Sequence, residues 1–294
     1  MIVTVLLTAL GALTVAFTGV LIQTAIRRHE LRPTLESIGL GAITNFFDTL
    51  GIGSFATSTA WIKLRNLVPD SFIPGTLNVG HALPTVAQAY IFIKLVDVDP
   101  ILLAACIAAA VAGSIIGAPI VVRLPVRVVQ GVVGIALLIA ASLYALSNMG
   151  MMPVGGDALA LAAGPLAIAV VGHFVMGALM TFGIGLYAPS LILLSLLGLN
   201  PIAAFPIMMG ACAFLMPVCG MRFIRAERIN LRVVIGLALG GIPLVLVAAF
   251  LVKSLPLETL RWGVVVVVLY AAILLLRSAV QPSMQQEAGV KLAQ

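Results

Sequence analysis

Charged residues are scarce in this sequence. They make up 9% of the 294 residues, whereas hydrophobic residues make up 62%. A soluble domain usually has about 25% charged and about 45–50% apolar residues. The mean hydropathy is +1.22, and several apolar runs reach the roughly 20 residues that cross the hydrocarbon core of a bilayer. The composition therefore excludes an ordinary soluble protein and predicts one multi-pass membrane domain over residues 1–294.

Cysteine is also rare, and the residue patterns of membrane enzymes are missing. Cys106, Cys212 and Cys219 all lie in apolar runs, which favours buried thiols over a disulfide framework. An intramembrane enzyme needs a nucleophile with a base, or a metal cluster. The sequence has no His-Glu-x-x-His, no paired intramembrane aspartates and no Gly-x-Ser-x-Gly. An enzyme is therefore the least favoured class, and we expect neither a cofactor nor a metal.

Acidic residues are fewer than basic ones, which gives a net charge of +6. The basic residues gather between apolar runs, where Lys and Arg set the orientation of membrane proteins. A nucleic-acid-binding protein would need a basic soluble face, and none is visible. The first apolar run, about residues 2–26, has its basic residues after it and not before it. We therefore expect an uncleaved span, not a signal peptide.

What the sequence does contain is one stretch that occurs twice. TLGIGSFATS (Thr49–Ser58) returns as TFGIGLYAPS (Thr181–Ser190), with six of the ten positions identical. Such a recurrence indicates an internal repeat, and Pro33 and Pro165 precede the two copies at the same distance. We expect repeat one over about residues 2–125, repeat two over about 126–280, and a disordered tail over 281–294.

The expected fold is all-α. Each repeat is a span, a segment broken by the Gly-x-Gly pair, and two more spans, and one extra span closes the second repeat. The broken segments cover about residues 34–64 and 165–197. The seven full spans cover about residues 2–26, 72–93, 101–122, 128–146, 203–221, 233–252 and 262–276.

The basic residues favour one of two topologies. If both broken segments are re-entrant hairpins and the N-terminus is outside, only Lys94, Lys253 and Arg261 among the basic residues remain outside. If both segments cross the membrane, the basic residues divide more evenly. The positive-inside rule therefore favours inverted repeats with one hairpin entering from each face, as in many secondary transporters. In this topology the C-terminus is cytoplasmic. We expect the protein to lie in the cell membrane, that is, the inner or plasma membrane.

The two glycine breaks suggest an anion site. Paired Gly-interrupted segments in matching halves are the best sequence pointer to a transport site, although a Gly-x-Gly pair can also serve helix packing alone. The short helix after each break, starting near Ser54 or Leu186, has unpaired N–H groups and the positive end of its dipole at the break. The expected substrate-binding residues are Thr49, Gly51, Gly53, Ser54, Thr57, Asn78, His81, Thr181, Gly183, Gly185, Tyr187 and Ser190.

Asp48 is the one acidic residue deep in a span. Intramembrane carboxylates often mark proton pathways, so we expect Asp48 to couple transport to protons; alternatively, Asn45 or a backbone donor satisfies it. His81 and His173 could titrate or be core histidines. Thr49 and Thr181 could bind their own helical carbonyls.

These motifs resemble the sulfite exporter TauE/SafE family of permeases. The second copy, Gly183–Pro201 with residues 203–212, carries the resemblance best, the first copy from Gly51 to Asn78 is looser, and the resemblance covers about residues 35–280. It implies proton-coupled transport of sulfite, organosulfonates or related anions. Where the family commonly has three glycines after the break, this chain has Ser54-Phe55 and Leu186-Tyr187, which we expect to narrow the pocket.

The favoured function is therefore a proton-coupled exporter of a small sulfur oxyanion, and the alternative is a passive anion channel with the same hairpins. The expected partners are a small inorganic or organic anion, protons and the lipid bilayer. Nucleic acid is not expected, and a homodimer is left open.

Overall fold

The computed structural model describes residues 1–151 and 156–251 and the positions 269, 272, 273, 276, 277 and 280. The described part is helical, with one isolated β-bridge and no strand. The expected tail at 281–294 and most of the expected span at 262–276 lie outside it. The elements are α1 (Ile2–Arg27), α2 (Leu35–Thr49), α3 (Ser54–Arg65), η1 (Asp70–Phe72), α4 (Ile73–Gly80), α5 (Ala82–Leu95), α6 (Pro100–Val121), α7 (Val126–Asn148), α8 (Ala163–Met180), α9 (Tyr187–Leu196), α10 (Pro201–Arg225) and α11 (Leu231–Leu251).

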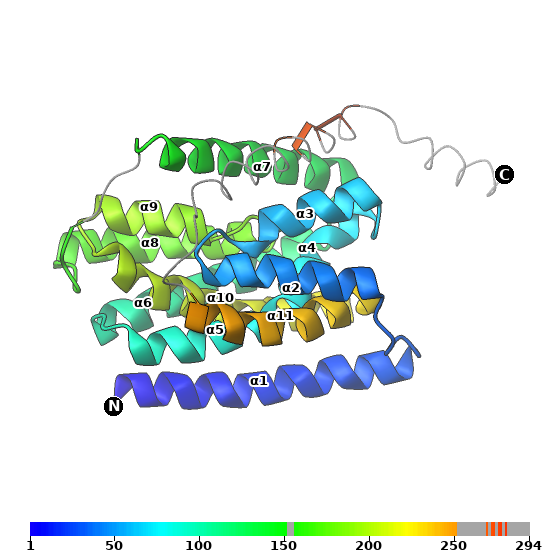
Figure 1. Ribbon diagram of the computed structural model, residues 1–294, viewed down its shortest axis with the longest axis horizontal. Coiled ribbons are helices and arrows are strands. Elements are labelled where there is room, and N and C mark those ends of the chain that lie inside the picture. Colours follow the sequence, from blue (N-terminus) through cyan, green and yellow to red (C-terminus); the bar gives the residue numbers. More distant parts are fainter. Residues whose placement is uncertain (152–155, 252–268, 270–271, 274–275, 278–279, 281–294) are drawn as a thin grey trace.

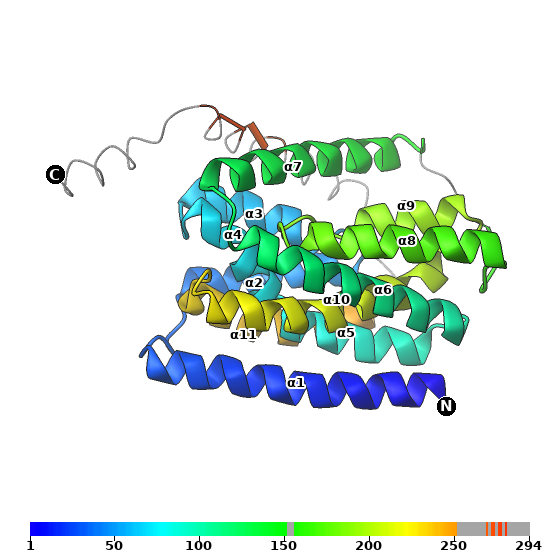
Figure 2. The same cartoon turned by 180° about the vertical axis from the view of Figure 1, so that it is seen from behind.

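Five helices in the described part are long and apolar enough to cross a membrane, which confirms the membrane character read from the composition. They are α1, α6, α8, α10 and α11. Their burial differs greatly. In the most apolar 18-residue stretch of each helix, 78% of the residues are buried in α10 but only 17% in α1. Figures 1 and 2 show α1 along one side of the helix stack and α7 along the opposite side, with α10 between them. The core is therefore built around α10.

Each expected broken segment consists of two helices joined at its glycines. The φ angles of Gly51, Gly53 and Gly183 are +85°, +86° and +89°, a region that residues with a Cβ rarely adopt. The first helices, α2 and α8, therefore end at these positions, and α3 and α9 begin a few residues later.

In both segments the second helix returns towards the start of the first. Glu36, in the first turn of α2, accepts hydrogen bonds from Arg65 Nε (2.8 Å) and Trp61 Nε1 (3.1 Å) in α3. In the second segment, the backbone N–H of Asn200 donates to the carbonyl of Ala158 (2.8 Å) shortly before α8 begins. Each pair of helices is therefore a hairpin in shape.

The open ends of the two hairpins lie at opposite ends of α10. Asn200 caps the start of α10 through a bond from Ile202 N to Asn200 Oδ1 (2.8 Å), and Asn200 also contacts the second hairpin as described above. Just after the end of α10, Glu227 pairs with Arg28 at the end of α1 (2.5 Å). Ser37 of α2 donates to the carbonyl of Arg232 at 3.4 Å, which places the first hairpin at that end.

The expected span at 72–93 is not one helix. It divides into η1, α4 and α5, with His81 between α4 and α5. Pro84 has no N–H to donate to the carbonyl of Gly80, and its ring crowds that carbonyl. The helix is therefore interrupted one turn before the proline.

The hairpins pack closely on helices of the opposite half. A Cβ on Gly240 of α11 would meet the carbonyl of Ile38 in α2, and a Cβ on Gly177 of α8 would meet the carbonyl of Ala110 in α6. Small residues of this kind allow membrane helices to approach backbone to backbone. The first helix of each hairpin is thus held by the other half of the chain, α2 on α11 and α8 on α6.

Candidate functional site

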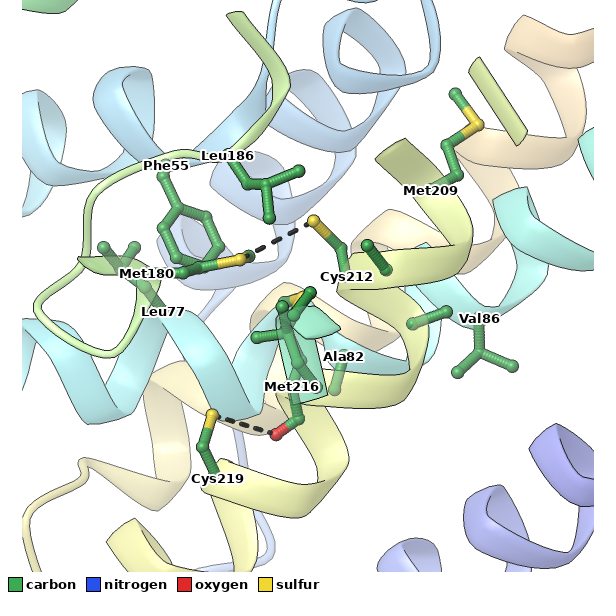
Figure 3. Packing of buried hydrophobic residues seen from close by; sticks show 14 of the residues in the cluster. Phe55, Leu77, Ala82, Val86, Met180, Leu186, Met209, Cys212, Met216 and Cys219 are labelled. Atoms are coloured by element: carbon green, nitrogen blue, oxygen red, sulfur yellow. Dashed lines mark hydrogen bonds between the residues drawn. The ribbon is translucent and has the colours of Figure 1, made fainter. Parts of the chain in front are cut away.

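The two glycine breaks line one cavity of about 370 Å³. Gly53 and Ser54 contribute from the first break, and Gly183 and Gly185 from the second. A Cβ on Gly185 would lie 3.6 Å from Cβ of Phe55, so the backbones of the two breaks are neighbours. Figure 3 shows Phe55 and Leu186, one from each break, close to Met180 and Cys212, which line the same cavity.

Asp48 lies in the last turn of α2 and lines the cavity, although it is only 3% exposed. Its Oδ1 accepts the backbone N–H of Ser54 at 2.5 Å, and its Oδ2 accepts Gln88 Nε2 at 2.9 Å. A carboxylate at the N-terminus of a helix is stabilised by the helix dipole. This corrects one expectation, because the first N–H of α3 is not free for a ligand but is capped by Asp48.

Gln88 of α5 does not line the cavity itself but connects two lining residues, one from each half of the chain. Its Nε2 donates to Asp48 Oδ2 and to Thr49 Oγ1, both at 2.9 Å, and its Oε1 accepts the hydroxyl of Tyr187 in α9 at 2.8 Å. Gln88 is not in the predicted substrate-binding set, although the sequence marks it, with Asn78 and His81, as a polar residue of the expected span at 72–93 that could face a cavity.

The N-terminus of α9 keeps unpaired donors. Within the described part of the chain, the backbone N–H groups of Leu186, Tyr187 and Ala188 have no hydrogen-bond partner, and all three residues line the cavity. Pro189 follows them and has no N–H. Such a helix start attracts anions because of its free donors and its dipole.

Apart from Thr85, the rest of the described cavity wall is apolar, and among the described residues no Lys or Arg lines the cavity. One face of α7 supplies Val132, Ile135, Ile139 and Leu143. Gln130 of the same helix donates to Asp70 Oδ2 (2.6 Å), which holds α7 beside η1. Among the described residues, the groups of this cavity that could bind an anion are therefore backbone dipoles and hydrogen-bond donors.

Seven of the sequence-predicted site residues do not line the cavity. Thr49, Thr57 and Thr181 bind helical carbonyls of Asn45, Ser54 and Ala178 at 2.8, 3.0 and 2.6 Å, the structural alternative given above for Thr49 and Thr181. The other four are Gly51, Asn78, His81 and Ser190. The residues of the predicted set that do line it are Gly53, Ser54, Gly183, Gly185 and Tyr187, together with Asp48.

The last serine of each repeated motif is held by a buried histidine. Ser58 lies 2.9 Å from His81 Nε2, and Ser190 lies 2.9 Å from His173 Nε2. His173 Nδ1 is 2.8 Å from the carbonyl of Ala169. Because a carbonyl only accepts, Nδ1 carries the proton and Nε2 accepts the hydroxyl of Ser190. These pairs fix α9 to α8, and α3 to the boundary between α4 and α5.

The Ser58–His81 pair continues to Asn45, and the three side chains are hydrogen-bonded in the sequence nucleophile, base and orienting group, as in catalytic triads. His81 Nδ1 lies 3.0 Å from Asn45 Oδ1, in addition to its bond with Ser58. The three side chains are buried, and none of them lines the cavity at the breaks. A nucleophile must reach its substrate, so we interpret this cluster as a structural network.

Comparison of the chain with protein-family models, with curated proteins and with solved structures gives no match. The resemblance to the TauE/SafE permeases therefore rests on the motifs of the sequence alone.

Proposed function

We propose that this chain is a secondary transporter that moves a small anion together with protons. The observation that carries the proposal is the shared cavity, in which two glycine breaks meet around the buried carboxylate of Asp48. The free N–H groups at the start of α9 supply the anion-binding donors. A small sulfur oxyanion is the substrate class that the motif resemblance favours.

Asp48 supplies a physical reason for coupling. An ionised carboxylate and a bound anion about 4 Å apart repel each other by roughly 4 kcal/mol at an effective dielectric constant of 20. Protonation of Asp48 removes this repulsion, and the resulting carboxyl group still accepts the N–H of Ser54. The anion and one proton then enter the cavity together, and export occurs when the outward anion gradient exceeds the inward proton gradient.

The arrangement of the hairpins supports the inverted topology. Their open ends lie at opposite ends of α10, and their glycine breaks meet near its middle, where Cys212 and Met216 line the cavity. In a bilayer this corresponds to two re-entrant hairpins that enter from opposite faces. Transporters use this arrangement to hold a substrate at the midplane.

The test is anion flux in proteoliposomes with an imposed pH gradient, using sulfite first and then sulfate, thiosulfate and small sulfonates. Asp48→Asn should abolish pH-driven accumulation while downhill anion exchange persists, because the amide cannot release a proton. Asp157→Asn, on an exposed loop, is the matched control and should behave like the wild type. Flux that ignores both the pH gradient and Asp48→Asn would favour the passive channel. Folded protein that moves none of these anions would contradict the proposed substrate class.

A further inference from the structure

A second hollow, of about 450 Å³, lies between the C-terminal parts of α6 and α10. No residue of either glycine break lines it. The residues around it are Ser114, Ile115, Ala118, Val122 and Arg123 on the α6 side, and Val218, Cys219, Met221, Arg222, Arg225 and Ala226 on the α10 side. It is therefore a separate space from the cavity at the breaks.

Three arginines gather at this hollow, and the described residues that line it include no carboxylate. Arg123, Arg222 and Arg225 are exposed, and no ion pair in the described part of the chain involves them. The nearest acidic residue in sequence, Glu227, is already paired with Arg28. Arginines at helix C-termini complement the helix dipole, but three guanidinium groups around one hollow also repel each other. An oxyanion would relieve this repulsion and match their planar donor geometry.

The hollow is one helical turn of α10 away from the cavity at the glycine breaks, which is called the central cavity from here on. Cys219 lines the hollow, whereas Met216 lines the cavity. Cys219 Sγ lies 3.4 Å from Asn78 Oδ1, and Asn78 Nδ2 donates to the carbonyl of Met180 at 3.0 Å, just before the second break. Figure 3 shows Cys219 and Met216 on successive turns of the same helix.

From this geometry we propose that the arginine hollow (Arg123, Arg222 and Arg225) is an oxyanion-binding site at the mouth of the route to the central cavity. The binding site rests on the hollow itself, and its place on a route rests on the proposed transport function. A free oxyanion and the phosphate of a lipid head group share the required chemistry. We assign the free oxyanion as the occupant.

The first test measures the electrostatic potential at the hollow from the rates at which charged reagents modify a thiol, and it does not depend on transport. In an Ala226→Cys variant, an anionic methanethiosulfonate should modify the new thiol faster than a cationic one. Arg222→Gln with Arg225→Gln should lower this rate ratio by roughly three- to tenfold, which is the scale of exposed charge interactions. Arg27→Gln removes an exposed arginine that does not line the hollow and should leave the ratio unchanged. The wild type, whose Cys219 is 1% exposed, gives the baseline. An equal fall with Arg27→Gln, or no fall in the double variant, would overturn the site.

The second test distinguishes the occupants. Sulfate should slow modification of Ala226→Cys in nanodiscs of phosphatidylcholine alone, and this protection should be lost in the double arginine variant. If modification is slowed only in nanodiscs that contain phosphatidylglycerol, and without sulfate, the occupant is a lipid phosphate. That result would overturn the proposed site for a free oxyanion at the mouth of the route. No protection in either membrane would overturn the oxyanion site. Because neither arm measures flux, a transport assay without activity would remove the proposed function but would not decide this site.

Discussion

Three side chains hold the two glycine breaks in one hydrogen-bonded chain. Asp48 belongs to the first hairpin, Tyr187 belongs to the second, and Gln88 binds both. All three are buried. Because a buried polar atom that loses its partner keeps its desolvation cost, each link should matter for the stability of the cavity as well as for its chemistry.

Tyr187→Phe removes the hydroxyl that Gln88 Oε1 accepts and leaves that oxygen buried without a partner. We expect a loss of about 1–3 kcal/mol in the free energy of unfolding, together with reduced anion flux. Thermal unfolding in detergent measures the first, and proteoliposome flux measures the second. Tyr90→Phe is the matched control, since the hydroxyl of Tyr90 donates to the carbonyl of Leu7 at 2.8 Å, far along the sequence from the breaks. A flux equal in both variants would show that the Gln88 link serves stability alone.

From the sequence, the position of Asp48 near the site could be predicted, but the hydrogen-bond partners of Asp48 and of the motif threonines could not. Asp48 stood out because it is an acidic residue in an apolar run, and the structure places it at the cavity. Its bond to Ser54 crosses the glycine break, and no local pattern shows how far that break folds back. The threonines of the motif were expected as ligands, yet their hydroxyls bind their own helices, an option open to any threonine in a helix.

At the scale of elements, the breaks depend on glycine backbone conformations. Gly53 has φ +86° and ψ 138°, so Gly53→Ala should cost about 1–3 kcal/mol and displace Ser54 from Asp48. Gly39→Ala is the control, because a Cβ there meets nothing within 4 Å inside α2, and it should be neutral or stabilising by about 0.5–1 kcal/mol. Thermal unfolding of both variants checks this. Equal stability of the two variants would contradict a strained break.

Helix boundaries followed from local signals, but the role of α7 did not. The two broken segments and the limits of α1, α6, α10 and α11 lie close to those expected from apolar runs and glycines. The row of Val132, Ile135, Ile139 and Leu143 is equally suited to face lipid or a cavity, so only the tertiary arrangement shows that it lines the site. The break at His81 could have been read from Pro84.

For the molecule as a whole, the arrangement predicts where two loop residues lie. Asn66 follows α3 at the open end of the first hairpin, and Asn200 precedes α10 at the open end of the second. Single cysteines at these positions should therefore react with a membrane-impermeant reagent from opposite sides of the membrane. Labelling of unpermeabilised and permeabilised vesicles measures this. Reaction of both from the same side would contradict inverted hairpins.

The recurrence of one motif can be read from the sequence, but the exchange of partners between the two halves of the chain cannot. Gly177 and Gly240 looked like ordinary small residues of apolar runs. Only the folded chain shows that each lies against the backbone of a helix from the other half of the chain. Pairings between distant segments are set by packing, which a single sequence does not encode in any local pattern.

Under the proposed transport function, this exchange of partners limits how the protein could alternate between an inward and an outward opening. Because α2 lies on α11 and α8 lies on α6, the halves cannot rock apart as rigid bodies without separating both glycine-lined contacts. A hairpin could instead slide lengthwise along its partner helix, since glycine leaves no side chain in its way. Access would then change by a shear of hairpins against a fixed frame of long helices.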